Sequence, residues 1–180
     1  GFLGPDLAGI AAEKAGILKP GVVGVIGPQE PAALAVIEAR AQEIGAPLVL
    51  HGRDWNVIPS PIEADKFSVK VPALTYERLA VPGLLGPHQL MNAGLAVAAI
   101  DQLKGFNVGH GALNEAIRDT RWPARLQKLE GGRMMKNLND RDELWLDGAH
   151  NPGAAVALAE QFKLWEAKDK RTLVLIVGML

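Results

Sequence analysis

The chain has 180 residues, of which 48% are hydrophobic, and its formal net charge at pH 7 is -1. This length and composition allow one large or two small domains to bury a real core, which excludes intrinsic disorder. Nucleic acids and anionic membranes bind surfaces with clustered positive charge. The near-zero net charge does not indicate such a surface, so we expect neither as a partner. The sequence has no cysteine and no apolar run near the roughly 20 residues of a transmembrane helix, so we expect a cytoplasmic protein without disulfides.

The first 50 residues alternate helical and strand patterns. The run Gly4-Pro5-Asp6 is typical of a helix start and predicts a helix over residues 5–15. Short apolar strands are predicted at residues 22–26 and 47–50, with a helix opened by Pro31 between them. Such strands, joined by helices, indicate a mostly parallel sheet covered by helices on both faces.

The first helix carries a lysine on its apolar side. Leu7, Ile10, Ala11 and Lys14 follow one another at helical spacing, so they are expected to share one face. A lysine in such a place usually extends to water or pairs with a neighbouring acid such as Glu13. The alternative is a functional lysine whose charge is changed by burial or by covalent modification.

The predicted secondary structure changes twice in the middle of the chain. Alternation between residues 54 and 79, clearest at Phe67, Val69 and Val71, predicts a small antiparallel sheet. Helical patterns follow over residues 87–103 and 110–118.

A break at residues 121–123 ends this part of the chain. Beyond it we predict a strand or hairpin within residues 124–137, a strand at 144–147, a helix at 152–166 and a strand at 173–177. This second alternation indicates a new domain, so we predict domains at residues 1–121 and 122–180. The last predicted strand has nothing after it to pair with, so we expect the sequence to be a piece of a longer polypeptide.

The stretch D-G-A-H-N-P occupies residues 147–152, between a predicted strand and a predicted helix. Asn151 is a suitable helix cap and Pro152 a suitable first helical residue, before an apolar stripe of Ala155, Leu158, Phe162 and Trp165. Asp147 and His150 are therefore expected at the carboxyl end of a parallel strand, where α/β sheets bind ligands, and the following helix start favours anions. The alternative is that Asp147 caps a turn and that His150 is a solvated loop residue.

Two further places have suitable chemistry for a nucleotide. Gln89 and Asn92 are three residues apart at a predicted helix start, and side-chain amides match the donor and acceptor edge of adenine, although such amides also cap helices. Arg125 lies beside the predicted domain junction, where its forked donors can hold a phosphate.

Taken in order, four segments resemble motifs of the folylpolyglutamate synthase and dihydrofolate synthase family, a branch of the Mur ligase superfamily of ATP-dependent amide-forming ligases. They are I-A-A-E-K-A-G-I-L-K-P-G from Ile10, L-L-G-P-H-Q-L-M-N-A from Leu84, W-P-A-R-L-Q from Trp122 and D-G-A-H-N-P from Asp147. The resemblance covers essentially the whole chain. One departure is Ala124, where the family usually has glycine.

The resemblance implies an α/β fold: the later part of a central ATPase domain, with a mostly parallel sheet and a small antiparallel part, followed by the start of a Rossmann-like C-terminal domain. It implies that ATP phosphorylates a carboxylate of dihydropteroate or a reduced folate, and that L-glutamate then attacks the acyl phosphate. Lys14 would be carbamylated by CO2 and would help to hold Mg2+ near the phosphates. A full-length member would be a monomer.

The resemblance also assigns the remaining site residues. Gln89 and Asn92 would lie near the adenine, and Arg125 would contact a phosphate. Asp147 would lie near the ribose hydroxyls, and His150 near the phosphates and the incoming amino acid.

The 180 residues contain no G-x-x-x-x-G-K-[ST] phosphate loop. We therefore expect them not to catalyse the ligation alone. Two other readings stay open: a peptidoglycan-type Mur ligase acting on a UDP-MurNAc-peptide, and a non-catalytic α/β nucleotide-binding or interaction module.

Overall fold

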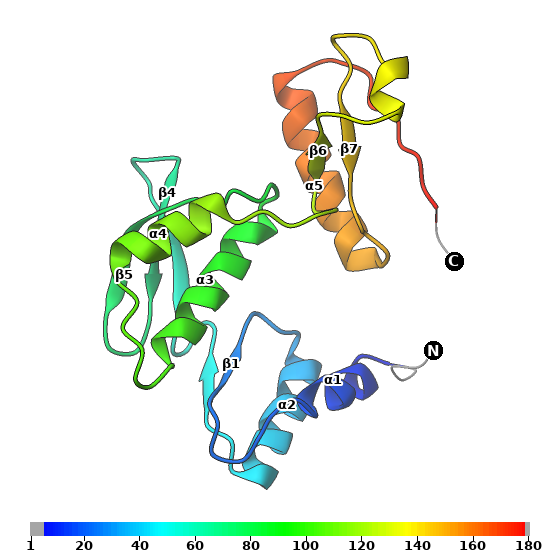
Figure 1. Ribbon diagram of the computed structural model, residues 1–180. Helices are drawn as coiled ribbons and strands as arrows, with labels where there is room; N and C mark the ends of the chain where they lie inside the picture. Colours follow the sequence, from blue (N-terminus) through cyan, green and yellow to red (C-terminus); the bar gives the residue numbers. More distant parts are fainter. Residues whose placement is uncertain (1–5, 179–180) are drawn as a thin grey trace.

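A computed structural model describes residues 6–178 of the chain (Figure 1). The fold is α/β, as predicted, and its elements form three groups along the chain. The first group contains α1 (Leu7–Ala15), β1 (Gly24–Ile26), α2 (Pro31–Ile44) and β2 (Leu48–Leu50). The second contains β3 (Asn56–Pro59), β4 (Lys66–Lys70), β5 (Thr75–Ala80), α3 (His88–Asp101) and α4 (His110–Asp119). The third contains β6 (Gln127–Leu129), a short 3-10 helix (Met134–Asn137), β7 (Leu144–Leu146) and α5 (Pro152–Lys168).

Helix α1 begins two residues later than predicted. Asp6 is its cap, and its side chain accepts a hydrogen bond from the Gly9 N–H at 2.7 Å. The carboxylate satisfies a backbone donor that has no partner within the helix, which is the reason that an acid suits this position. Pro5, which we predicted as the first helical residue, lies outside the described residues.

The buried face of α1 agrees with the predicted one only at Ala11. Ala11 and Ala15 are the buried residues, and α1 packs through this side against α2. Leu7 and Ile10 are 45% and 36% exposed, and Lys14 is exposed as well. The prediction that Lys14 shares a buried apolar stripe is wrong, because small alanine side chains let the two helices approach closely and therefore set the contact face.

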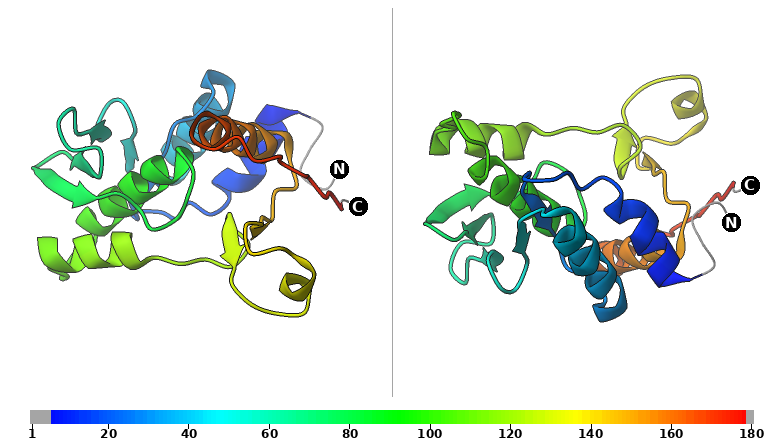
Figure 2. Two further views of the ribbon diagram at one scale, coloured as in Figure 1. Left: turned by 90° about the horizontal axis from the view of Figure 1, so that it is seen from above. Right: turned by 90° about the horizontal axis from the view of Figure 1, so that it is seen from below.

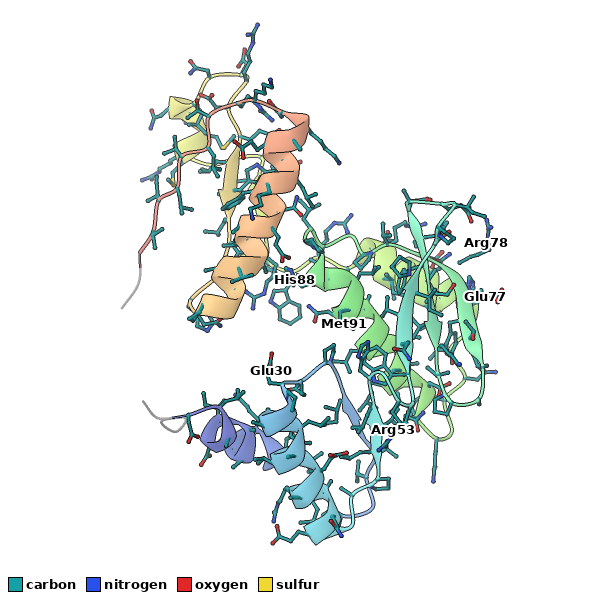
Figure 3. The ribbon with its side chains drawn as sticks, turned by 180° about the vertical axis from the view of Figure 1, so that it is seen from behind. Glu30, Arg53, Glu77, Arg78, His88 and Met91 are labelled. Carbon is teal, nitrogen blue, oxygen red and sulfur yellow. The ribbon has the colours of Figure 1, made fainter. Side chains whose placement is uncertain are left out.

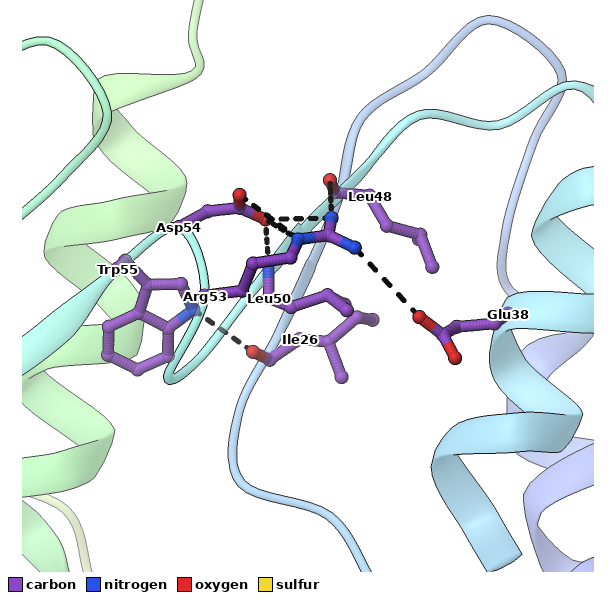
Figure 4. A network of polar contacts seen from close by, with 7 residues as sticks. All are labelled: Ile26, Glu38, Leu48, Leu50, Arg53, Asp54 and Trp55. Carbon is purple, nitrogen blue, oxygen red and sulfur yellow. Dashed lines mark hydrogen bonds and ion pairs between the residues drawn. The ribbon is translucent and has the colours of Figure 1, made fainter. Parts of the chain in front are cut away.

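Strands β1 and β2 pair in parallel, with Gly24 opposite Leu48 and Ile26 opposite Leu50. This confirms a parallel pair joined by a helix, and the described part of this sheet has two strands. The chain then turns tightly: the Asp54 carboxylate accepts from the Leu50 N–H at 2.8 Å, and the Trp55 indole donates to the Ile26 carbonyl at 3.0 Å (Figure 4). The fully buried Trp55 therefore joins the parallel pair to the central group.

Strands β3, β4 and β5 form the predicted antiparallel sheet, in that order. Helix α3 packs on this sheet, and it approaches the sheet closely at Gly94, because a Cβ there would collide with Val57. Between the sheet and the helices lies the main core, made of Trp55, Phe67, Val69, Val71, Leu79, Val97, Ala98, Leu113 and Ile117.

The third group holds its own small apolar cluster. The Trp165 ring of α5 lies 4.7 Å from the Trp145 ring of β7 and 5.6 Å from the Phe162 ring, measured between centroids. Asn151 caps α5 as predicted, with its side-chain oxygen accepting from the Ala154 N–H at 2.9 Å. Ala155, which we placed on the apolar stripe, is exposed.

Two further predictions for the third group are wrong. Strand β7 runs antiparallel to β6, because the connection between them contains a single 3-10 turn and not the crossover helix that a parallel pair requires. Residues 173–177 do not form a strand: this segment extends away from α5 without pairing to any described strand (red in Figure 2), and Ile176 is 83% exposed. An apolar sequence alone does not make a strand, because a strand needs a neighbour for its backbone hydrogen bonds.

Within residues 6–178, none of the helices combines the length and the apolar character needed to cross a bilayer.

Candidate functional site

A cavity of about 640 Å³ lies where the second and third groups meet. Its walls come from the start of α3, from the segment that leads into β6, and from the turn between β7 and α5. Figure 3 shows His88 at the start of α3, on the side that faces α5. The lining residues are Leu84, His88, Gln89, Asn92, Trp122, Arg125, Asp147, Gly148, Ala149, His150, Asn151, Gly153, Ala154, Ala157 and Leu158.

Five of the six predicted site residues line this cavity: Gln89, Asn92, Arg125, Asp147 and His150. They come from three motifs that are separated in the sequence. Lys14, the sixth, is not among the lining residues.

The amides at the start of α3 are connected to each other by hydrogen bonds. The Asn92 Nδ2 donates to Gln89 Oε1 at 3.1 Å, and the Gln89 Nε2 lies 3.0 Å from His88 Nε2. Gln89 is 6% exposed, which is low for a glutamine, whereas Asn92 and His88 are exposed. The buried Gln89 therefore holds His88 and Asn92 by hydrogen bonds. The exposed His88 and Asn92 side chains are the ones that a ligand can contact.

The turn between β7 and α5 is held by the Asp147 carboxylate. One oxygen accepts from the Leu126 N–H and the other from the Ala149 N–H, both at 2.8 Å. Asp147 thus caps this turn, and it also joins the turn to the segment that carries Arg125. The His150 Nδ1 lies 2.9 Å from the Gly148 carbonyl. A carbonyl only accepts, so Nδ1 carries a proton, and in the neutral ring Nε2 is the acceptor.

Arg125 lies between two residues with an unusual backbone. Ala124 has φ 54° and Leu126 has φ 43°, both in the left-handed region that disfavours side chains. These two conformations turn the chain sharply, bury Leu126 and leave Arg125 exposed at the cavity. The Arg125 guanidinium donates to the Ala124 carbonyl at 3.3 Å, so most of its donors are available to an anion.

Sequence reasoning did not select two lining residues with useful chemistry. His88 was visible as part of the motif L-L-G-P-H-Q, directly before Gln89, and its hydrogen bond to Gln89 required the structure. Trp122 marks the predicted chain break and opens the motif W-P-A-R-L-Q without a predicted role of its own, and it lines the cavity with 64% of its surface exposed.

The part of the chain that the structure describes contains no group of three or more His, Asp or Glu side chains able to hold a metal ion.

No family model matches the chain. Among curated proteins, the dihydrofolate synthase/folylpolyglutamate synthase of Bacillus subtilis is 32% identical over 181 residues, which is 96% of this chain and 39% of that protein. The Escherichia coli protein of the same description is 32% identical over 182 residues, or 99% of this chain and 37% of that protein. The chain thus spans well under half of the length of these relatives.

Solved structures agree in fold. The Mycobacterium tuberculosis folylpolyglutamate synthase complexed with ADP superposes with a TM-score of 0.74 at 28% identity, over 91% of this chain and 36% of that one. The S73A mutant of the L. casei enzyme gives 0.75 at 26% identity, over 99% of this chain and 42% of that one. The chain belongs to the dihydrofolate synthase/folylpolyglutamate synthase family. Its α/β architecture is accordingly the Mur-ligase type expected from the four motifs.

Proposed function

We propose that the chain forms one wall of the ATP site in a ligase that adds L-glutamate to dihydropteroate or to folates through an acyl phosphate. The observation that carries this proposal is the convergence of Gln89, Asn92, Arg125, Asp147 and His150 on one cavity. Support comes from the family's solved structures, which include an E. coli complex with DHPP and ADP and an AMPPCP–folate complex.

The cavity suits a nucleotide in volume and in chemistry. About 640 Å³ lies within the usual range of ligand sites. The exposed Asn92 amide, which is hydrogen-bonded to Gln89, provides a donor and acceptor edge for a base, and the amino end of α5 favours phosphate. The exposed Arg125 guanidinium adds a cation for the phosphates.

In the proposed reaction, a carboxylate of the acceptor attacks the γ-phosphorus of ATP, and ADP leaves. The amine of L-glutamate then attacks the acyl phosphate, forming the amide and releasing phosphate. Arg125 and the α5 start would stabilise charge on the phosphoryl group. His150 has a free Nε2, which would accept the proton that the ammonium group of glutamate must lose before attack.

Lys14 would hold Mg2+ as a carbamate, whose two oxygens are the kind of ligand that this cation prefers. The exposed Nζ is accessible to CO2, although the described residues contribute no ready-made cluster of metal ligands around it. When bound, Mg2+ would supply charge neutralisation at the phosphates. The carbamate is tested by intact-mass analysis in bicarbonate: a gain of one CO2 is expected for the chain and none for Lys14→Gln.

We further propose that residues 1–121 and 122–180 belong to two domains, each with its own apolar cluster. The full-length ligase is proposed to be a cytoplasmic monomer that requires a phosphate-binding loop from outside these 180 residues.

Nucleotide binding by the chain tests the proposed site. ATP is expected to bind the 180-residue chain and to change the fluorescence of Trp122, which lines the cavity. Arg125→Ala should weaken binding about tenfold, because a charge-assisted contact is lost. Arg121→Ala is the matched control, because Arg121 donates to the Arg118 and Thr120 carbonyls and is outside the cavity lining. If Arg125→Ala and Arg121→Ala weakened ATP binding equally, the assignment of this cavity as the nucleotide site would be refuted.

Catalysis is tested by ADP release with L-glutamate and either dihydropteroate or tetrahydrofolate. The 180-residue chain alone is expected to release no ADP above background. A protein that joins this chain to the phosphate loop should release ADP only when both glutamate and an acceptor are present. Glutamate-dependent release by the chain alone would contradict the requirement for an outside loop.

A further inference from the structure

The imidazole of His88 is the end of a hydrogen-bonded chain of three side chains. With the Gln89 Nε2 facing the ring, this amide donates and His88 Nε2 accepts, so the neutral ring carries its proton on Nδ1; the other tautomer would require the Gln89 amide to turn over. Gln89 then presents Oε1 to Asn92, which donates through Nδ2. The directions of the hydrogen bonds in this chain are therefore coupled to the tautomer of His88.

Gly86 leaves room for the imidazole in this position. Gly86 has φ 118°, which a side chain rarely allows. A Cβ at Gly86 would lie 2.6 Å from His88 Cε1 and 2.9 Å from His88 Nδ1. The space left by the absent Cβ is thus occupied by the ring, and the Gln89 N–H donates to the Gly86 carbonyl at 3.0 Å, which closes the same turn.

We propose that His88, seated against Gly86, is a positioning residue that sets the orientation of the Gln89 and Asn92 amides and thereby the purine that the cavity accepts. With His88 accepting, Asn92 turns its nitrogen toward Gln89 and leaves its Oδ1 free for an exocyclic amine, as in adenine. If both amides turned over, Asn92 would offer only donors, which suit a purine with an oxygen at position 6. The purine part of this inference rests on the proposed nucleotide site, whereas the orientation of the amides does not.

Nitrogen-15 NMR of the 180-residue chain tests the orientation without any nucleotide. Under alkaline conditions, His88 is expected as the Nδ1–H tautomer with an unprotonated, hydrogen-bonded Nε2. His88→Phe keeps a ring but removes the acceptor, so the side-chain NH2 signals of Gln89 and Asn92 should shift. His88→Gln supplies a carbonyl acceptor and should restore them. Asn114 accepts from the Ala80 N–H and is outside the cavity lining, so it is the internal reference and its signals should not shift in either variant.

Two NMR results would overturn the proposal. One is an Nε2–H tautomer at His88, and the other is a His88→Phe chain whose Gln89 and Asn92 signals match those of the unsubstituted chain. If the Asn114 signals also shift, the variant has changed the fold. The tautomer of His88 in the unsubstituted chain then decides whether the proposal holds.

The second measurement compares the affinities for ATP and ITP. The unsubstituted chain and His88→Gln should prefer ATP by about tenfold, the size of one paired base contact, and His88→Phe should lose most of this preference. Binding of ATP with an unchanged preference in His88→Phe would refute the role in purine selection. Absence of binding by either nucleotide would instead refute the proposed function, and the NMR result would still decide the orientation.

Discussion

Ala124 is the residue at which this chain departs from its family's usual glycine, and the structure shows why glycine suits the position. The backbone of Ala124 has φ 54°, and a side chain in this region costs about 1–2 kcal/mol. The conformation is retained because the neighbouring turn is fixed by the Asp147 carboxylate, which accepts from the Leu126 N–H. The backbone of Ala124 is therefore strained, and the structure gives the reason why glycine would fit this position better.

Ala124→Gly is expected to raise the free energy of unfolding of the third group by about 1 kcal/mol, because it removes this strain. Urea unfolding is the measurement. Leu126→Gly relieves a similar strain at φ 43° but deletes a side chain that is 5% exposed, so it should destabilise. Ala159→Gly, on the exposed side of α5, should also destabilise, by about 1 kcal/mol. A destabilised Ala124→Gly chain would contradict the assigned backbone conformation.

The Asp54 carboxylate makes stability depend on pH. Hydrogen bonds from the Arg53 guanidinium are the largest cause that lowers the pKa of Asp54, with a further contribution from the Leu50 N–H. A carboxyl whose pKa is lower in the folded state stabilises above its unfolded pKa, and this contribution is lost as the pH falls through the folded pKa.

Asp54→Asn should therefore lower the free energy of unfolding at pH 7, and the difference from the unsubstituted chain should shrink below about pH 4. Urea unfolding at a series of pH values measures it. Arg53→Met, which removes the main cause of the shift, should reduce the same acid dependence without abolishing it, because the Leu50 N–H still donates to Asp54. A gap between Asp54→Asn and the unsubstituted chain that stays constant down to pH 3 would refute the assignment.

At the scale of elements, the position of α3 depends on a residue without a side chain. Gly94 is buried in the helix interior, where glycine is otherwise unfavourable, and it faces Val57 of β3 and the ring of Trp55. At this position, the close packing of the helix on the sheet outweighs the unfavourable helix propensity of glycine.

Gly94→Ala should destabilise the chain by about 1–3 kcal/mol, because the added methyl group overpacks the contact with Val57. Gly111→Ala is the matched control: Gly111 lies in α4 with nothing within 4 Å of its Cβ position, so alanine should stabilise by up to about 1 kcal/mol. Thermal unfolding followed by circular dichroism distinguishes the two signs. Equal shifts for both variants would show that helix propensity, and not packing, controls α3.

At the scale of the whole molecule, the two apolar clusters are expected to unfold separately. Trp55 belongs to the main core, whereas Trp145 and Trp165 belong to the third group. The third group buries little apolar surface, which predicts a lower stability for residues 122–180.

The indole N–H signals of Trp55 and Trp165 should therefore disappear at different urea concentrations, with Trp165 lost first. Gly94→Ala should lower the midpoint at Trp55 and leave that at Trp165 unchanged. One shared midpoint that moves with Gly94→Ala at both tryptophans would contradict a domain boundary at residue 122.

The sequence by itself determined most of the elements and most of the site. Caps and periodicity placed α2, α5 and the antiparallel sheet, because these signals act between residues a few positions apart. The four motifs identified the family and five residues of the cavity, because the residue types and their spacing in these motifs are visible in the sequence.

Only the tertiary structure decided which faces meet. It exposed Lys14 by packing α1 through its alanines, turned β7 antiparallel to β6, and left residues 173–177 without a strand partner. It also joined three distant motifs into one cavity. These outcomes depend on contacts between residues far apart in the chain, which local propensity does not encode.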